Sequence, residues 1–153
     1  VYLPNGNPVD SPKFPYKLSW MSRLKNHAKS LLSHEEAVIL GGDYNVIPTD
    51  EDVYDAEAWK GDALCMPETR EKFREIIYLG YTEAFRALHT GAEHYTFWDY
   101  QGRAFESDRG LRIDHFLLSP QATDRLAKCN IDPVPRGWKK ASDHTPVICE
   151  LTD

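Results

Sequence analysis

The chain has 153 residues, 41% of them hydrophobic, which is enough for one domain spanning residues 1–153 with its own core. Eighteen basic against 24 acidic residues give a net charge of -6, which excludes a global positive field that holds nucleic acid non-specifically. No apolar run approaches the about 20 residues of a membrane span, and no signal peptide is visible. Three cysteines without metal-ligand spacing favour reduced thiols in a cytoplasmic protein.

The first half of the chain predicts two amphipathic helices around one buried strand. Apolar residues recur near every 3.6 positions over 13–33 and over 68–79, and Gly80 would end the second helix. Between them, the apolar run 37–41 ends in two glycines, which is typical of a central strand covered on both faces. The acidic segment 47–67 is expected to be a solvated surface loop with a short helical piece at 56–59.

The second half predicts four strands, at 95–100, 111–119, 129–131 and 145–151, the last of them buried. Thr82 is expected to cap a short helix over 83–89. Residues 120–127 are expected to form a helical turn or two. The segment 133–142 is a basic loop broken by prolines. Strands interleaved with helices indicate an α/β or α+β fold.

Polar residues follow the first predicted strand. Asp43 and Asn45 lie two positions apart, so their side chains point the same way if the strand continues. The alternative is a strand end closed by an Asx turn. Either arrangement places a carboxylate and a carboxamide at one end of the sheet.

Two further polar clusters lie beside predicted strands. Asp114 is expected to face the same way as Arg112, and a carboxylate inside an apolar strand is costly unless it is paired or bound to a metal. Asp143 and His144 directly precede the last strand, and a histidine beside a carboxylate suits acid–base chemistry near neutral pH. Together the three clusters suit phosphoryl chemistry assisted by Mg²⁺, a cation that prefers oxygen ligands.

Five segments together resemble the exodeoxyribonuclease III family of DNA-repair enzymes, within the endonuclease/exonuclease/phosphatase superfamily. They are YLPNG at 2–6, GDYN at 42–45, TFWDY at 96–100, GLRID at 110–114 and SDHTPV at 142–147. The resemblance covers essentially the whole chain. It implies a DNase I-like four-layer α-β-β-α sandwich, of which this chain corresponds to the C-terminal half, with the site at one rim of the sheets.

The resemblance also implies residue roles. Asp43 matches the residue that handles the nucleophilic water, Asn45 one that contacts the phosphate, and Asp114 the partner that orients the catalytic His144. Asp143 matches a carboxylate near the metal, Mg²⁺ with Mn²⁺ as the alternative. Tyr2 and Asn5 match residues that contact the phosphate. The residues that match the apolar pocket for a flipped-out abasic sugar are Phe97, Trp98, Leu111 and Ile113. A place in the core explains Ile113 equally well.

DNA binding by an acidic chain needs local positive charge. The loops flanking the expected site supply basic residues, either for phosphate contacts or as ordinary solvated charge: Arg103, Arg109, Arg112, Arg136, Lys139 and Lys140. The resemblance implies duplex DNA with abasic sites or 3′ ends as the partner.

The chain begins at Val1 without an initiator Met, and the family's main metal-holding glutamate belongs to a segment that would precede Tyr2. We therefore expect a C-terminal portion of a longer enzyme, with the N-terminal half as a missing partner. Alone, it is expected to bind Mg²⁺ weakly, to have little or no nuclease activity and to self-associate through uncovered strand faces.

The leading hypothesis is a Mg²⁺-dependent DNA phosphodiesterase acting at abasic sites and 3′ ends, associated with the nucleoid in a bacterial-type cytoplasm. One alternative is a phosphodiesterase or phosphatase of the same superfamily acting on inositol phosphates, sphingomyelin or another non-DNA substrate. The other is a non-catalytic binding module whose strand-end acids serve only as caps.

Overall fold

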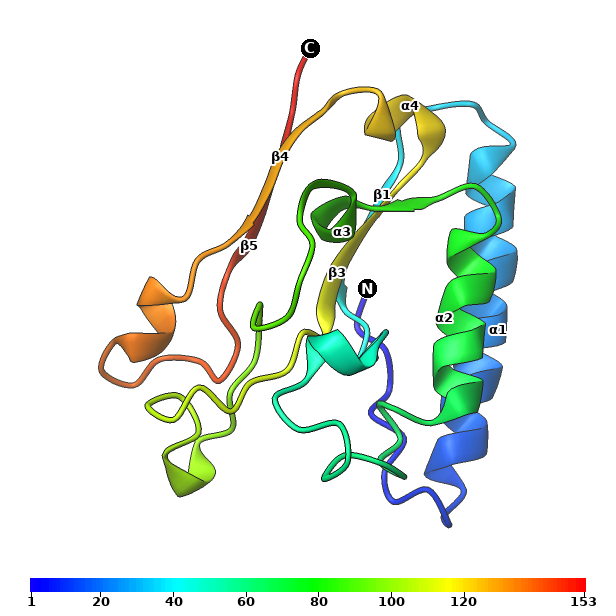
Figure 1. The fold of residues 1–153 in the computed structure, drawn as a ribbon. Helices are drawn as coiled ribbons and strands as arrows, with labels where there is room; N and C mark the ends of the chain where they lie inside the picture. The colour runs from blue at the N-terminus through cyan, green and yellow to red at the C-terminus, as the bar shows by residue number, and fades with distance from the viewer.

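The structure is a computed structural model that describes all residues 1–153. Its elements are α1 (Lys13–Leu32), β1 (Ile39–Asp43), the short 3₁₀ helix η1 (Asp50–Asp52), α2 (Pro67–Ile77), β2 (Thr82–Glu83), α3 (Ala84–Leu88), η2 (Gln101–Arg103), β3 (Asp114–Leu118), α4 (Pro120–Thr123), β4 (Leu126–Ile131), η3 (Val134–Gly137) and β5 (Val147–Leu151). Both long helices and the strand between them lie within a few residues of their predicted bounds. The predicted α/β class is confirmed (Figure 1).

The central sheet has the strand order β1-β3-β2, and both pairings are antiparallel. Asp43 at the end of β1 lies directly opposite Asp114 at the start of β3. A parallel bridge between Tyr2 and Asp43 adds the N-terminal segment beside β1. The register therefore brings the first and second polar clusters of the sequence to one end of the sheet.

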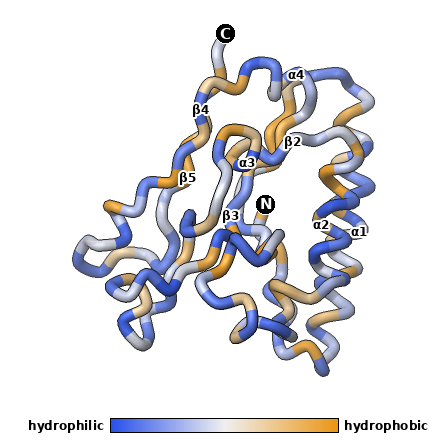
Figure 2. The backbone as a smooth tube through the Cα atoms, in the orientation of Figure 1, coloured by the Kyte–Doolittle hydropathy of each residue, from blue (hydrophilic) through white to orange (hydrophobic).

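The helices α1 and α2 lie side by side over one face of the central sheet (Figure 1). Hydrophilic and hydrophobic residues mix along both helices, as expected of amphipathic helices (Figure 2). Met21, Leu24 and Ala28 from α1 and Phe73 from α2 pack into the core with Leu117 of β3. This packing fixes the strands that carry the acidic side chains.

The strands β4 and β5 form a separate two-stranded antiparallel sheet, in which Cys129 lies opposite Cys149. Cys129 packs with Phe85, Leu118 and Ala122 in another hydrophobic cluster, so this sheet packs against the central sheet through α3 and β3. The prediction of a buried last strand is wrong, because β5 alternates between half-buried and exposed residues. A strand with one covered face alternates in this way.

The segment 95–100 is not a strand, contrary to the prediction. Its alternating aromatic residues pair only through isolated bridges, from Phe97 to Leu111 and from Phe97 to His144. The next strand likewise begins at Asp114 rather than at Leu111. These two bridges join the second and third polar clusters.

None of the helices combines the length and the apolar character that a membrane crossing requires.

Candidate active site

The end of β1 fixes the Asp43 carboxylate. The Asn45 backbone N–H donates to Asp43 Oδ1 at 2.8 Å, and the Asn45 side-chain Nδ2 donates to Asp43 Oδ2 at 3.2 Å. Asn45 has a positive φ of 47°, so the strand does not continue and the Asx-turn alternative is the correct one. The turn still places both side chains together.

Asn45 has no free N–H, because its Nδ2 also donates to the carbonyl of Leu3 at 2.8 Å. Its Oδ1 accepts a hydrogen bond from Asn5 Nδ2 at 3.4 Å. A phosphate contact through this amide would replace the bond to Asp43. In this arrangement Asn45 orients Asp43.

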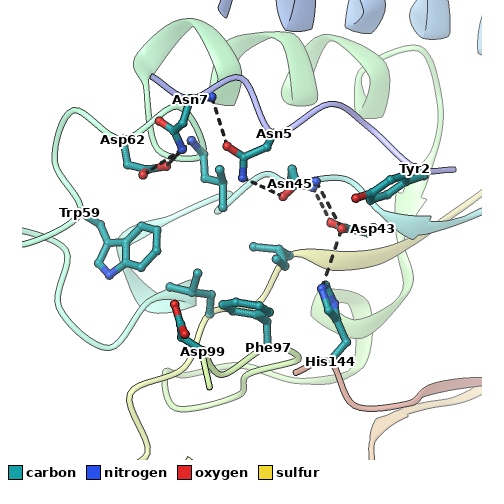
Figure 3. Close-up of a pocket in the computed structure, with 13 residues that line it drawn as sticks. Tyr2, Asn5, Asn7, Asp43, Asn45, Trp59, Asp62, Phe97, Asp99 and His144 are labelled. Atoms are coloured by element: carbon teal, nitrogen blue, oxygen red, sulfur yellow. Dashed lines mark hydrogen bonds and ion pairs between the residues drawn. The ribbon is translucent and has the colours of Figure 1, made fainter. Parts of the chain in front are cut away.

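The imidazole of His144 lies between the carboxylates of Asp114 and Asp43, and Figure 3 shows it facing Asp43. Its Nδ1 is 2.8 Å from Asp114 Oδ2, a hydrogen-bonding distance. Its Nε2 is 3.9 Å from Asp43 Oδ2, too long for a direct hydrogen bond. Asp43, Asp114 and His144 therefore lie together, and the distance between Nε2 and Asp43 Oδ2 is one that a single oxygen atom can bridge.

Burial and charge shift the pKa values of this group. Burial raises the pKa of Asp43 above its ordinary value and the charge of Asp114 adds to that, whereas the Asn45 hydrogen bond and the charge of His144 oppose it. Burial alone would lower the pKa of His144, but the hydrogen bond and charge of Asp114, together with the charge of Asp43, raise it overall. The His144 imidazole therefore stays protonated at a higher pH than a free histidine does.

Thr96 connects the strand that bears Asp114 to the loop that bears His144. Its hydroxyl oxygen accepts hydrogen bonds from the backbone N–H groups of Ile113 and Asp114, at 3.1 and 3.2 Å. Its carbonyl accepts one from Thr145 N at 2.8 Å. Phe97 then lies edge-on to the His144 ring, with the centroids 5.1 Å apart. These contacts explain how a segment that is not a strand positions the histidine.

A cavity of about 300 Å³ opens beside these groups (Figure 3). Besides Asp43, Asn45 and His144, the predicted residues that line it are Tyr2, Asn5, Phe97, Leu111 and Ile113. Residues that the sequence did not indicate also line it: Asn7, Trp59, Asp62, Leu64 and Asp99. Asn7 Nδ2 lies 3.1 Å from each oxygen of the Asp62 carboxylate. The cavity thus has one apolar wall and one wall of amides and carboxylates.

Lys17 is a functional candidate that sequence reasoning missed. Its side chain is fully buried, and its Nζ donates to the carbonyls of Asn45 at 2.5 Å and Asn5 at 2.9 Å. Burial lowers its pKa to about 7, although the charges of Asp62 and Asp43 counteract this. On the sequence it lies on an amphipathic helix between Tyr16 and Leu18, and nothing in the pattern separates it from a surface lysine.

Two predicted substrate contacts are wrong in this structure. Trp98 is 4% exposed and packs with Tyr95 and Phe105 rather than lining the cavity, and its Nε1 donates to Asp108. Arg112 is 1% exposed, so its guanidinium cannot reach a DNA phosphate. Both residues stabilise the loops around the site instead.

Arg112 belongs to a buried ion-pair network. Its Nε is 2.7 Å from Asp52 Oδ1 and its Nη1 is 3.1 Å from Glu83 Oε1, and Arg86 pairs with the same Asp52 oxygen. The guanidinium also approaches His115 Nδ1 at 3.2 Å, so Arg112 does not share the side of Asp114 as predicted. The expectation that the acidic loop is wholly solvated is likewise wrong, because Asp52 is fully buried.

The chain does not assemble a metal site from its own side chains. Although Asp43, Asp114 and His144 lie close together, no three His, Cys, Asp or Glu side chains are arranged so that they could hold an ion. Asp143, the predicted ligand, is half-buried and does not line the cavity. Its carboxylate accepts only a long hydrogen bond from Ser142 Oγ at 3.5 Å, and its backbone carbonyl accepts one from Trp98 N at 2.9 Å. A divalent cation would need oxygen donors beyond those present here.

A pair of carboxylates around a histidine, at the rim of a β-sheet and beside a partly apolar cavity, is an arrangement that suits phosphoester chemistry. Comparison with protein families agrees, since residues 1–144 match the endonuclease/exonuclease/phosphatase family. The chain belongs to that family.

Individual relatives narrow the similarity to DNA-repair nucleases. The chain is 29% identical to exodeoxyribonuclease III of Haemophilus influenzae over 98% of its own length and 59% of the relative's. It superposes on the 3′ phosphatase NExo from Neisseria, solved bound to a product DNA hairpin, with a TM-score of 0.95 and 37% identity over 99% of this chain and 59% of that one. An AP endonuclease from Archaeoglobus fulgidus gives a TM-score of 0.93 and 32% identity, again over 99% and 59%. The chain therefore spans little more than half the length of these relatives.

Proposed function

We propose that this chain carries the His–Asp part of a DNA-repair nuclease that hydrolyses phosphodiesters at abasic sites and at 3′ ends. The observation that carries the proposal is the position of His144, hydrogen-bonded to Asp114 at 2.8 Å and facing Asp43 across 3.9 Å at the edge of the cavity. The relatives named exodeoxyribonuclease III and AP endonuclease support the same reaction.

In the proposed reaction, a water molecule attacks the phosphorus atom and the bond from phosphorus to the leaving oxygen breaks. Asp43 accepts the proton of that water, a role supported by its raised pKa. His144, held in its protonated form by Asp114, lies where it stabilises the charge that develops on the phosphate. Tyr2 and Asn5, which line the same cavity, would contact the phosphate or its neighbour.

The apolar wall of the cavity, formed by Phe97, Leu111 and Ile113, is the proposed pocket for an abasic sugar. An abasic nucleotide has no base to unstack, so turning it out of the duplex costs little. A sugar without a base also fits against apolar side chains that offer no hydrogen bonds.

A divalent cation, Mg²⁺ or Mn²⁺, is part of the proposal, with Asp143 as its ligand. When bound, it would supply positive charge to the phosphate oxygens. Because this chain groups no three suitable side chains, the other donors would come from a partner segment or from the substrate. We therefore expect the 153 residues alone to bind Mg²⁺ weakly and to have little activity. Addition of a polypeptide that corresponds to the part of the relatives outside this match should restore the activity.

A second candidate reaction is removal of a 3′ phosphate from DNA. The similarity to a 3′ phosphatase at 37% identity favours it, and the same water, Asp43 and His144 would serve. Action on inositol phosphates or another non-DNA substrate, and a non-catalytic binding role, are the alternatives that the experiment below separates. The proposed location is the cytoplasm, in association with the nucleoid.

The test compares cleavage of an abasic duplex, a 3′-phosphorylated duplex and a phosphoinositide by the complete gene product that contains this chain. We expect cleavage of one or both DNA substrates and none of the phosphoinositide. In the Asp43→Asn variant the rate should fall by about 10²- to 10⁴-fold, because the proton acceptor is lost. An unchanged rate in that variant would support the non-catalytic alternative.

Self-association of the chain is a separate part of the proposal. Ile39 of β1 and Ile148 of β5 are 44% and 47% exposed, and pairing these strand faces between copies would remove them from water. Small-angle scattering of a dilute sample tests this, and a compact monomer argues against it.

A further inference from the structure

A second cavity of about 270 Å³ lies next to the one described above. Asp99 lines both of them. The walls of this second cavity are formed mainly by the loop around η2 and the loop around η3: Tyr100, Arg103, Phe105, Arg136 and Trp138. We name it the aromatic cleft. It presents aromatic rings together with the guanidinium groups of Arg103 and Arg136 and the carboxylates of Asp99 and Glu106.

The two outer rings of the aromatic cleft are largely uncovered, since Trp138 and Tyr100 are 65% and 63% exposed. Large aromatic side chains usually bury most of their surface, because leaving it in water forgoes a favourable transfer free energy. Two such rings that line one cavity therefore form a surface suited to another flat, apolar group.

The aromatic cleft is held in place by specific contacts. Arg136 donates to the carbonyl of Trp98 at 2.9 Å, and its guanidinium lies 5.2 Å from the ring centroids of both Tyr100 and Phe105. The Tyr100 hydroxyl donates to the carbonyl of Ala141 at 3.0 Å, which ties the two loops together. A surface fixed in this way loses little conformational entropy when it binds a ligand.

The charged side chains that line the cleft balance, Arg103 and Arg136 against Asp99 and Glu106, but the neighbouring loop segment is basic. The segment 133–142 carries three basic residues and no acidic one, in a chain of net charge -6. Lys139 and Lys140 directly follow Trp138 and are exposed. Exposed aromatic rings combined with local positive charge are the features with which proteins bind single-stranded nucleic acid, through base stacking and phosphate contacts.

We propose that the aromatic cleft is a stacking site for an unpaired base of the DNA strand whose phosphate lies at His144. The unpaired base stacks on Trp138 or Tyr100, and the adjacent phosphates lie against Lys139 and Lys140. This proposal rests on the proposed function in one respect only, which is that the bound strand is the one whose phosphate lies at His144. It implies that frayed or single-stranded ends bind better than fully paired ones.

The test measures, by fluorescence anisotropy, the affinity of the chain for a labelled oligothymidylate and for a duplex containing the same strand. Trp138→Ala should weaken oligothymidylate binding about tenfold and leave duplex binding nearly unchanged, because a stacked base loses its platform. Trp138→Phe should retain binding within about threefold, since a phenyl ring still offers an aromatic face. Circular dichroism checks that each variant is folded.

The matched control is Tyr78→Ala, which removes an 80% exposed aromatic side chain at the end of α2, outside both cavities. It should change neither affinity. The proposal is overturned if Trp138→Ala leaves oligothymidylate binding intact, if it weakens both nucleic acids equally, or if the unaltered chain does not bind the oligothymidylate. Cleavage assays on the complete gene product are read separately, so binding that depends on Trp138 without cleavage would refute the nuclease and leave the stacking site standing.

Discussion

Asp114 and His144 are 30 residues apart in the sequence, yet the carboxylate of one lies 2.8 Å from the imidazole Nδ1 of the other. The pairing fixes which nitrogen carries a proton toward Asp114 and leaves Nε2 facing Asp43. A histidine held in this way has one orientation and one free nitrogen for chemistry. The proposed nuclease reaction depends on this relationship.

Replacing either partner should therefore slow cleavage in the complete gene product. We expect His144→Asn and Asp114→Asn each to lower the rate on abasic duplex by about 10²- to 10⁴-fold. The double variant should be little worse than the worse single variant, because the two side chains act as a unit. Strictly additive losses, measured as a double-mutant cycle, would contradict this coupling.

The raised pKa of His144 leads to a prediction about pH. Because the folded state favours the imidazolium, its contribution to stability is fully present below the ordinary pKa of about 6.5 and is lost as pH rises through the raised folded value. An NMR titration of the His144 ring should give a midpoint above 6.5, and Asp114→Asn should lower it. If the midpoint does not move in that variant, the hydrogen bond is not its cause.

The sequence predicted the site well where the chemistry is carried by side chains beside strands. Asp43 and Asp114 stand at the ends of apolar runs that pair as β1 and β3, which brings the two carboxylates together, whereas the isolated bridge from Phe97 positions His144. The two long helices were also predicted correctly, because the spacing of their apolar residues is visible within each segment of the sequence. The register that places Asp43 opposite Asp114 is set by the pairing of β1 with β3, which no local pattern contains.

The errors came from long-range contacts. Arg112 resembles a phosphate-binding residue in the sequence, and only the approach of Asp52 and Glu83 from distant segments makes it a buried ion-pair partner. The family resemblance assigns Trp98 to the cavity together with Phe97, but the bridges at Phe97 turn the next side chain into the loop core. Trp59 lines the cavity from a loop without periodicity, so no pattern could have indicated it.

The buried network around Arg112 should contribute to stability. Arg112→Met leaves two carboxylates, Asp52 and Glu83, without their main counter-charge in the interior, and we expect a loss of about 3–5 kcal/mol in the free energy of unfolding. Urea denaturation measures this loss. The control is Arg125→Met, at an exposed position, which should change stability by less than about 0.5 kcal/mol.

Acid should weaken the same network. Burial alone would raise the pKa of Asp52, but the charge and hydrogen bond of Arg112, together with Arg86, outweigh it and hold the pKa at about 2. A lowered folded pKa means that the stabilisation is present above the ordinary value of about 3.9 and is lost as pH falls toward the folded value. The difference in the free energy of unfolding between the unaltered chain and Asp52→Asn should therefore decrease as the pH falls from 5 to 2. The difference between those two pKa values sets the size of this decrease. A gap that stays constant over this interval would mean that Asp52 does not titrate as the ion pairs require.

Lys17 should affect the site through the backbone rather than by touching substrate. Its Nζ donates to the carbonyls of Asn5 and Asn45, the two residues whose side chains meet beside Asp43. In Lys17→Met the buried carbonyl of Asn45 loses a donor, at a cost of about 1–3 kcal/mol, the partly buried carbonyl of Asn5 loses one as well, and the turn that orients Asp43 loses its support. We expect lower stability in urea and, in the complete gene product, a larger fall in kcat than in the affinity for abasic duplex. Lys29→Met, at an exposed position of the same helix, is the control and should be neutral. Lys17→Arg should recover part of the activity, because a guanidinium still donates to carbonyl oxygens, whereas equal losses in Lys17→Arg and Lys17→Met would show that packing and not the two hydrogen bonds is what the site requires.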